Sequence, residues 1–393
     1  MKLACVIHRF GRDIAGGSEA HCRAIALHLA AAHDVTVLTS CASDHVSWAN
    51  HYPAGASSDG PLRVLRFPTA RTRNLPRFRD ISRTVFSGRA SDGEQEQWFR
   101  ENGPETPQLL DHLREHGREY DRVLFWSYRY FQTYFGLPIV ADRAVLVPTA
   151  EQDPLIHARA LEKFFALPAG YLFLTPEEAD LVGSCAPIRA PAAIIGCGVD
   201  PAAALDSAVR SELSAVDRLR DLTDPFLLYL GRVDPNKGCA SLLRNFLRYS
   251  ERRPGLHLVL AGPVNMPVPN HPAIRVLGFV KDALRETLLS RARVLMMPSP
   301  YESLSMVLLE AWNHGLPALV NARCAVLRGQ VRRADGGLYY RTSGEFAAAL
   351  DCLLDQPDLA RTLGAQGLAY VEREYRWPIV MSRIDALLQQ ITT

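Results

Sequence analysis

The sequence predicts an α/β protein with two doubly wound, Rossmann-like domains that face each other across a deep cleft. The chain of 393 residues is too long for one ordinary hydrophobic core and suggests about two domains. Short β-type segments alternate with helical patterns in both halves of the chain, as in doubly wound sheets. Most of these short segments are continuously apolar, which is expected of parallel strands covered on both faces.

The predicted strands fall into two groups. In the first domain we expect strands at residues 3–8, 35–38, 64–67, 123–126, 144–148, 171–175 and 192–195. In the second domain we expect them at residues 226–230, 257–261, 274–277, 294–297, 317–320 and 337–340. Ligands bind at the carboxyl ends of the strands in sheets of this kind, so the loops after these strands are the first places to look for a site.

Helices are expected between the strands. The clearest is at residues 19–32, where apolar side chains recur on one helical face at Ala20, Ala24, Leu27 and Ala31. The polar segment 200–224 is expected to form the hinge region. The domains are therefore predicted at residues 1–205 and 206–372.

Composition and charge exclude several functional classes. The formal net charge is only +2, so a nucleic-acid partner is not expected. No run approaches the ~20 apolar residues of a membrane span, and Arg9, Arg12 and Asp13 interrupt the N-terminal apolar stretch too early for a signal peptide. The eight cysteines include no CxxC pair, which argues for reduced thiols and against a disulfide framework or zinc site. A cytoplasmic location is expected.

The second domain opens with the sequence LLYLGRVDPNKG, residues 227–238. Here a strand leads into a turn that is flanked by Arg232 and Lys237. Two cations at the carboxyl end of a strand form a diphosphate clamp, the arginine by its fork geometry and the lysine as a point charge. The alternative is that both are ordinary surface charges. The segment is not a Walker A loop, and GCGVDP at residues 196–201 lacks the third glycine of a dinucleotide fingerprint.

A second element, ESLSMVLLE, places Glu302 and Glu310 on either side of an apolar stretch. The apolar side chains recur with helical period at Leu304, Val307, Leu308 and Ala311. A helix is expected to begin near Ser303 or Ser305, and its free amides suit a phosphate. Along a helix the two glutamates would lie about 12 Å apart, enough for one carboxylate to hold each end of a nucleotide-sugar. The alternative is a capping glutamate and a solvated helix residue.

Several motifs in order give the chain a family resemblance. They are AGGSEAH (15–21), VPTA (147–150), GCGVD (196–200), LGRVDPNKG (230–238), VLGFV (276–280), ESLSMVLLE (302–310) and GLPALV (315–320). With them the chain resembles the retaining GT-B glycosyltransferases of family 4 over essentially its whole length. Residues 372–388 resemble the last helices of that family, so a C-terminal helix at about 373–393 is expected to complete the first domain.

The resemblance implies roles for particular residues. Arg232 and Lys237 would neutralise the leaving diphosphate, and Glu302 would bind hydroxyls of the donor sugar. The remaining donor-binding positions are Gly16 and Gly17 near the diphosphate, Phe279 and Val280 at the base, the amides of Leu304 and Ser305 at the phosphate, and Glu310 at the ribose. Strand-end packing is the alternative explanation for Phe279 and Val280.

The implied activity is hexosyltransferase-type transfer from a nucleoside-diphosphate (NDP) sugar to an acceptor hydroxyl, with retention at the anomeric carbon. The acceptor would be a glycan, a lipid-linked molecule or a small molecule, in biosynthesis of cell-surface polysaccharide, lipopolysaccharide or another glycoconjugate. No Asp-x-Asp motif is present, so neither a metal nor a cofactor is expected. Two other interpretations stay open: a GT-B sugar-nucleotide epimerase, and a nucleotide-sugar-binding protein that has lost catalysis.

The sequence departs from the family in two places. Relatives often have a histidine after VPTA, where this chain has Glu151, and they often have an aromatic-glycine pair where this chain has Leu304-Ser305. One hypothesis is that Glu151 binds a sugar hydroxyl or amino group and helps to select the donor. The alternative is a shifted loop with Glu151 in solvent.

A basic segment in the first domain suggests a further hypothesis. Residues 63–89 carry eight arginines and a single acid, Asp80, with Phe78, Ile81, Val85 and Phe86 interleaved. An amphipathic basic segment of this kind could make peripheral contact with an anionic membrane on its inner face. The alternative is a solvated basic face.

Overall fold

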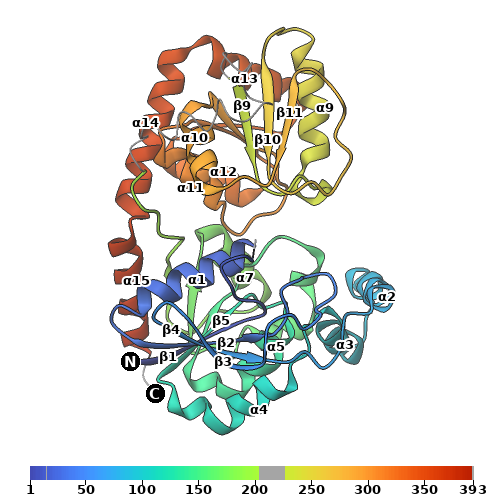
Figure 1. Cartoon of the computed structure of the whole chain (residues 1–393), viewed down its shortest axis with the longest axis vertical. Coiled ribbons are helices and arrows are strands. Elements are labelled where there is room, and N and C mark those ends of the chain that lie inside the picture. Colours follow the sequence, from blue (N-terminus) through green and yellow to red (C-terminus); the bar gives the residue numbers. More distant parts are fainter. Residues whose placement is uncertain (15, 203–225, 392–393) are drawn as a thin grey trace. The chain divides into compact units, whose positions relative to one another are not determined.

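The computed structural model describes residues 1–14, 16–202 and 226–391. It divides into two units, which we call unit 1 (Met1–Gly198 with Pro378–Thr393) and unit 2 (Val199–Trp377). Figure 1 shows the chain coloured along its sequence. The predicted boundary between residues 205 and 206, and most of the predicted hinge at 200–224, lie outside the described residues.

Unit 1 is built on one eight-stranded sheet with the order β3-β4-β2-β1-β5-β6-β7-β8. Its strands are β1 (Lys2–Ile7), β2 (Asp34–Ser40), β3 (Gly55–Asp59), β4 (Leu62–Phe67), β5 (Arg122–Trp126), β6 (Ala144–Val147), β7 (Gly170–Phe173) and β8 (Ala192–Ile194). All neighbours are parallel except β3 and β4, which are antiparallel. The prediction missed β3, an exposed edge strand of sequence GASSD, because it has no apolar residue beyond one alanine.

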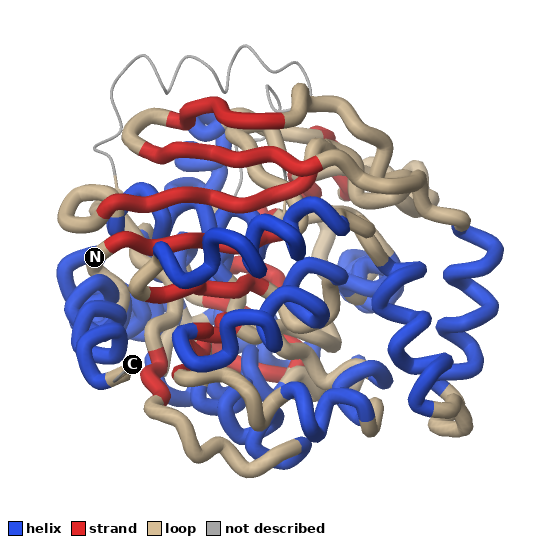
Figure 2. The backbone as a smooth tube through the Cα atoms, turned by 90° about the horizontal axis from the view of Figure 1, so that it is seen from below, coloured by secondary structure: helices blue, strands red, loops and turns tan. Residues whose placement is uncertain are grey.

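Helices lie between most of the strands of unit 1, and not all of them pack on the sheet. They are α1 (Gly17–Leu29), α2 (Leu75–Phe86), α3 (Asp92–Asn102), α4 (Pro107–His116), α5 (Phe131–Gly136), α6 (Ala160–Phe164), α7 (Pro176–Cys185) and α15 (Trp377–Gln390). Helix α15 is tied to the sheet of unit 1 by the Arg122 guanidinium, which donates to the carbonyl of Ile391. Helices α2 and α3 lie side by side at the edge of unit 1 in both views (Figures 1 and 2).

Unit 2 contains a six-stranded, fully parallel sheet with the order β11-β10-β9-β12-β13-β14. Its strands are β9 (Phe226–Leu230), β10 (His257–Ala261), β11 (Ile274–Gly278), β12 (Val294–Met297), β13 (Ala318–Asn321) and β14 (Gly337–Tyr340). Its helices are α9 (Cys239–Ser250), α10 (Asp282–Arg291), α11 (Met306–Asn313), α12 (Ala325–Ala334), α13 (Ser343–Asp355) and α14 (Pro357–Glu374). The central strands β9 and β12 are buried at every position, which explains their unbroken apolar sequences.

The strand orders identify one topological switch point in each sheet. In unit 2 the chain runs from β9 outward through β10 and β11 and then returns to β12 on the other side of β9. In unit 1 the equivalent reversal lies between β1 and β5. Ligands of open α/β sheets bind beside the carboxyl ends of the strands at such points. The loops after β9 and β12, and those after β1 and β5, are therefore the places where a site is expected.

Among the residues that the structure describes, no helix is both long enough and apolar enough to cross a bilayer.

Candidate active site

Two predicted catalytic residues of unit 2 meet directly. Lys237 ends the short 3-10 turn Pro235–Lys237 that follows β9, and Glu302 lies in the loop that follows β12. The Lys237 Nζ atom lies 2.9 Å from Oε1 of Glu302. The two side chains are only 28% and 11% exposed, so this ion pair is screened less by water than a surface pair would be. The structure thus brings one cation and one carboxylate together at the switch point of unit 2.

The two loops can approach because Gly238 has no side chain. Gly238 has a positive φ of 74°, and a Cβ atom at this position would lie 2.2 Å from the carbonyl oxygen of Pro298. The Ser299 hydroxyl also donates to the Lys237 carbonyl at 3.5 Å. The Lys237 turn and the Glu302 loop are therefore in contact through their backbones, and this contact sets the position of the ion pair.

Arg232 lies in the same loop after β9 but outside the ion pair. Its carbonyl accepts a hydrogen bond from the Tyr229 hydroxyl at 2.7 Å, which fixes the backbone. Its side chain is exposed, and no acidic side chain among the described residues lies within ion-pair distance of its guanidinium. Arg232 is thus a cation close in sequence to Lys237 whose charge is not neutralised within the described part of the chain.

Helix α11 begins later than Glu302. Ser305 is its N-cap, with Oγ accepting from the Leu308 amide at 3.2 Å, so of the two predicted caps Ser305 is used. The estimate of 12 Å between the glutamates assumed a helical path from residue 302, and that assumption is wrong because the chain is not helical before Met306.

The backbone amides of Leu304 and Ser305, which were expected to bind a phosphate, are only partly available. The Ser305 amide already donates to Oε1 of Gln330 at 3.2 Å, and Leu304 is buried, with 8% exposure. The amides of Met306 and Val307 lie in the first turn of α11, where they have no acceptor within the helix. The start of α11 therefore offers anion-binding amides just beyond the two residues that were predicted to supply them.

One carboxylate oxygen of Glu310 accepts a hydrogen bond, and the other has no partner among the described residues. The Arg285 guanidinium donates to Oε1 at 2.8 Å, whereas Oε2 is buried and has no hydrogen-bond partner among the described residues. Burial raises the pKa of this carboxyl and Arg285 opposes that change. A buried carboxylate oxygen without a partner is costly, so Glu310 is poised to accept a hydrogen bond from a ligand hydroxyl.

Phe279 and Val280 follow β11, the edge strand that lies two strands from β9. The chain turns there at Gly278, whose φ is 70°. Phe279 is 72% exposed, which is unusual for a residue with a large aromatic ring. An exposed ring beside the carboxyl end of a strand provides a flat apolar surface of the kind on which a base can stack.

Unit 1 has an ionic cluster at its own switch point that the sequence did not reveal. Glu19, in the first turn of α1, accepts from the Arg9 guanidinium and lies 3.0 Å from Nε2 of His8. The His8 ring stacks on Tyr130 at 3.6 Å, which joins the loop after β1 to the loop after β5. Burial alone would raise the pKa of Glu19, but His8, Arg9 and Ser18 together lower it, so the carboxylate is ionised. The available signal was His-Arg directly after β1, followed by an acid in the next helix.

Gly16 and Gly17 lie at the start of α1, the helix that carries Glu19 of this cluster. Gly16 is the N-cap residue of α1 and Gly17 is its first residue. A Cβ atom on Gly16 would lie 2.2 Å from Oε2 of Glu19. Gly16 therefore leaves room for the Glu19 carboxylate of its own helix, which is a structural role separate from the predicted approach to a diphosphate.

Glu151 follows β6 in a loop with unusual backbone. Thr149, just before it, has a positive φ of 49°, which costs energy for a residue with a branched side chain. The loop is held by Glu178, whose two oxygens accept from the amides of Ala150 and Leu174, both at 2.6 Å. Burial raises the pKa of Glu178 to about 8. Glu151 itself is half-buried at the carboxyl end of β6, and its role stays a prediction.

His21 connects α1 to the GCGVD loop as a neutral imidazole. Its Nδ1 accepts from the Trp126 indole at 3.0 Å, and its Nε2 donates to the Gly196 carbonyl at 2.8 Å. Burial lowers the pKa of His21 to about 4. Protonation would set an N–H against the indole N–H, so the fold requires the neutral form.

This requirement predicts a pH dependence of stability. Because the folded pKa is below the unfolded value of ~6.5, the contribution of His21 is complete above pH ~6.5 and falls by up to ~3 kcal/mol as the pH drops towards 4. Glu178, with its raised pKa, changes stability in the opposite direction, so the difference between wild type and His21→Ala must be measured. The difference in melting temperature should be largest at pH 7 and smaller at pH 5. A difference that is equal at both pH values would contradict the assignment.

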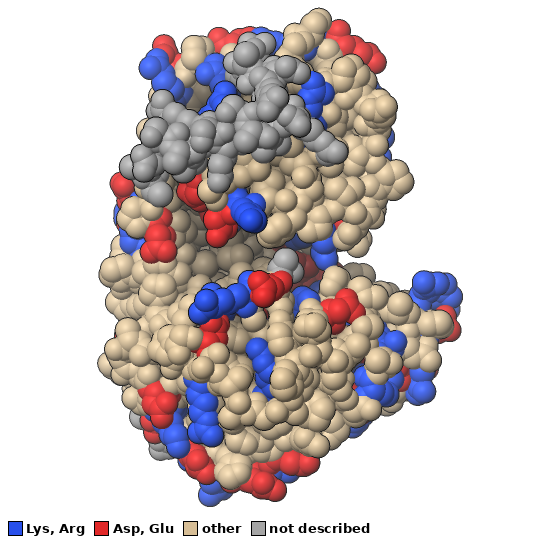
Figure 3. Space-filling view, viewed as in Figure 1, with Lys and Arg blue, Asp and Glu red and all other residues tan. Residues whose placement is uncertain are grey.

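Much of the basic segment is used inside unit 1. Arg71 pairs with Glu101 and Glu105, and Arg77 with Glu101. The apolar face of α2 packs inward, with Val85 in the core and Phe78 and Ile81 against it. The exposed large apolar side chains of α2 are Leu75 and Phe86. On the face drawn in Figure 3, acidic and basic side chains are interspersed on each unit.

The described residues contain no group of three or more His, Cys, Asp or Glu side chains arranged to hold a metal ion.

Sequence comparisons find relatives for part of the chain. Residues 224–356 match the family described as glycosyl transferases group 1. The chain is 25% identical over 182 residues to the uncharacterized glycosyltransferase YqgM of Bacillus subtilis, covering 44% of this chain and 51% of that protein. It is 28% identical over 165 residues to a glycogen synthase of Mycobacterium tuberculosis, covering 39% and 40%. The matches thus span about half or less of the length of these relatives.

Structural comparisons cover the whole chain. Sucrose-phosphate synthase from Thermosynechococcus elongatus superposes with a TM-score of 0.74 at 16% identity, over 100% of this chain and 99% of that one. Anabaena HepE, solved with UDP and glucose, gives a TM-score of 0.69 at 15% identity, over 99% and 100%. Identities this low establish the fold alone. The chain therefore has the GT-B fold, with two parallel-sheet domains, and carries a glycosyl transferases group 1 domain at residues 224–356.

Proposed function

We propose that the chain is a retaining glycosyltransferase of family 4 that transfers a sugar from an NDP-sugar to an acceptor hydroxyl. The observation that carries this proposal is the partly buried pair of Lys237 and Glu302 at the switch point of unit 2. The pair lies inside the segment that matches the glycosyl transferases group 1 family. HepE, which has the same fold, was solved with UDP and glucose, and this supports a nucleotide-sugar as donor. The product would belong to a cell-surface polysaccharide, lipopolysaccharide or other glycoconjugate.

The chemical step proposed for this site is stabilisation of the leaving group. Negative charge develops on the NDP as the glycosidic bond breaks, and preorganised cations and amides at that position lower the barrier. Lys237, Arg232 and the first turn of α11 would supply them without a metal ion. The acceptor attacks the same face from which the NDP leaves, and the departing phosphate takes the acceptor's proton. Glu302 would hold hydroxyls of the donor sugar and orient the Lys237 ammonium.

The nucleotide end of the donor would be held by Glu310 and Phe279. In this proposal the ribose hydroxyls donate to Oε2 of Glu310, the buried oxygen that has no partner among the described residues. Arg285 fixes the other oxygen of the same carboxylate and so sets its orientation. The exposed Phe279 ring would cover one face of the base. Glu151 would contact the donor sugar and contribute to donor choice.

The test is a panel of UDP-, GDP- and ADP-sugars with candidate acceptors, followed by NMR of the product. We expect NDP release that depends on the acceptor and a product with the anomeric configuration of the donor. Epimerised donor without any acceptor would identify an epimerase instead, and nucleotide binding without turnover of any donor would favour a binding protein. In the same panel Glu151→His and Glu151→Ala should change the rank order of donors. Variants that match wild type on every donor would exclude a role for Glu151.

A further inference from the structure

A second cationic site lies in unit 2, next to the Glu302 loop. An open pocket of about 530 Å³ is lined by Ala322, Arg323, Ala325, Arg328, Arg341 and Thr342. This volume falls within the range of ~300–1,000 Å³ typical of small-molecule sites. The pocket lies at the carboxyl ends of β13 and β14, the edge of the sheet where ligands bind.

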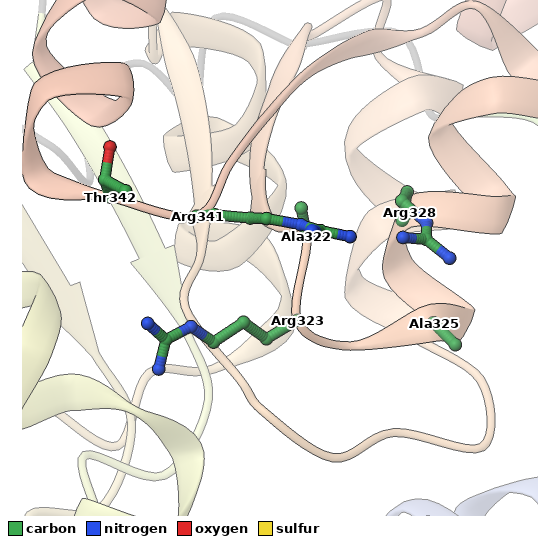
Figure 4. A pocket seen from close by; sticks show the side chains of 6 residues that line it. All are labelled: Ala322, Arg323, Ala325, Arg328, Arg341 and Thr342. Atoms are coloured by element: carbon green, nitrogen blue, oxygen red, sulfur yellow. The ribbon is translucent and has the colours of Figure 1, made fainter.

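Its three arginines come from three separate places in the chain. Arg323 precedes α12, Arg328 lies in the first turn of α12, and Arg341 follows β14. The Ala322 amide donates to the Tyr340 carbonyl at 2.8 Å, which holds the loops that carry Arg323 and Arg341 together. In Figure 4 the Arg341 side chain extends past Ala322 towards Arg328, while Arg323 projects from its loop in another direction. All three arginines line the pocket, and in this view Arg323 points away from the other two.

The charge of this pocket is not balanced within the described part of the chain. No acidic side chain there lies within ion-pair distance of any of the three guanidinium groups. Glu345 accepts from the backbone amide of Arg341 at 2.7 Å rather than from its side chain. Helix α12 begins in the pocket at Ala325, and the positive end of its dipole favours an anion as well. Like charges repel, so three arginines that line one pocket without carboxylate partners favour an anionic ligand.

The pocket adjoins the end of the donor site that would hold the sugar. Asn321, at the end of β13, donates to the carbonyl of Pro298 in the Glu302 loop at 3.0 Å. Cys324 lies close enough to Glu302 that the glutamate adds to the effect of burial, which raises the pKa of this thiol to about 11. The donor diphosphate is already assigned to Lys237 and α11. An anion in the arginine pocket would therefore be a different group from the donor diphosphate.

We infer that Arg323, Arg328 and Arg341 form a second oxyanion site, which binds a phosphate or carboxylate group carried by the acceptor. The inference that the anion belongs to the acceptor rests on the proposed function. The existence of the oxyanion site does not, because it follows from the three arginines and the cavity alone. A guanidinium binds either group through paired N–H donors, so phosphate and carboxylate are the chemistry that this pocket recognises.

The site is tested with inorganic phosphate as the probe, by calorimetric titration of the full chain. Wild type should bind phosphate, and Arg328→Ala/Arg341→Ala should weaken binding by roughly tenfold or more. Arg332→Ala removes an exposed arginine of the same helix that does not line the pocket, and it should bind as wild type does. Absence of binding, binding that survives the double substitution, or equal loss in Arg332→Ala would each overturn the second site.

The acceptor assignment is tested separately in a turnover assay with hexose phosphates, sugar acids and the matching neutral sugars. The double variant should raise KM for the anionic acceptors roughly tenfold, with KM for the donor unchanged. Preference for hexose phosphates over sugar acids would identify phosphate as the source of the anion, and the reverse would identify a carboxylate. A change in donor KM alone would overturn the assignment to the acceptor. If no donor is turned over at all, the proposed function fails, and the phosphate titration still decides whether the site exists.

Discussion

Lys237→Ala is expected to lower kcat by about 10²–10³-fold, a loss of roughly 3–4 kcal/mol of transition-state stabilisation. The reason is that the ammonium would stabilise charge that develops on the departing NDP and is absent from the bound donor. Arg232→Ala should act in the same direction. Lys237→Arg should recover part of the rate, since it keeps the charge but changes its geometry. The measurement is steady-state NDP release with saturating donor.

Arg248→Ala is the matched control, because Arg248 is an exposed cation of the same unit on helix α9. It should turn over donor at the wild-type rate. Removing Lys237 also leaves Glu302 without this ion pair in a position only 11% exposed, so the folded state of the variant must be verified by its melting temperature. A folded Lys237→Ala enzyme with the wild-type kcat would show that the ammonium takes no part in the reaction.

Gly238→Ala is expected to destabilise unit 2 by roughly 2–4 kcal/mol and to lower its melting temperature by roughly 5–15 °C. The backbone at residue 238 is left-handed, and the added methyl would lie 2.2 Å from the Pro298 carbonyl oxygen. Relief of that overlap must separate the Lys237 turn from the Glu302 loop, so donor turnover should fall together with stability. Differential scanning calorimetry and the NDP-release assay measure the two effects.

Gly255→Ala separates the two causes of this destabilisation. Gly255 also has a positive φ, of 88°, but no atom lies within 4 Å of a Cβ built there. Gly255→Ala should therefore lose only about 1 kcal/mol of stability, the cost of a left-handed backbone without a steric overlap, and it should keep full turnover. Equal effects of the two substitutions would mean that contact between the loops does not determine the position of the ion pair.

The strands could be predicted because burial on both faces leaves a direct trace in the sequence. β9 and β12 are apolar at every position, so their sequences identify them directly as buried strands. β3 could not be found in this way, because an edge strand needs only backbone pairing and its exposed side chains carry no pattern. The start of α11 was ambiguous for a local reason: Ser303 and Ser305 are equally good caps by type, and the choice depends on the loop that leads from β12.

Some residues of the candidate site could be predicted from the sequence, and others could not. Lys237 and Glu302 follow two strands that are neighbours in the sheet, so loop position and family resemblance both indicated them. The cluster of His8, Arg9 and Glu19 depends on contacts made when the loop after β1 folds against α1, and the motif that contains Glu19 does not indicate its partners His8 and Arg9. The arginine pocket was not predicted from the sequence, for a similar reason. Arg323, Arg328 and Arg341 are spread over 19 positions of the sequence and line one pocket because β13 pairs with β14.

The measurement that tests the donor site most directly is calorimetric titration of the chain with UDP, GDP and ADP, repeated on Lys237→Ala, Glu310→Gln and Arg248→Ala. We expect one nucleotide to bind wild type and Arg248→Ala alike, and to bind Lys237→Ala and Glu310→Gln roughly tenfold or more weakly. Failure of all three nucleotides to bind wild type, or equal affinity in all four proteins, would contradict a nucleotide-sugar site at the carboxyl ends of β9 and β12.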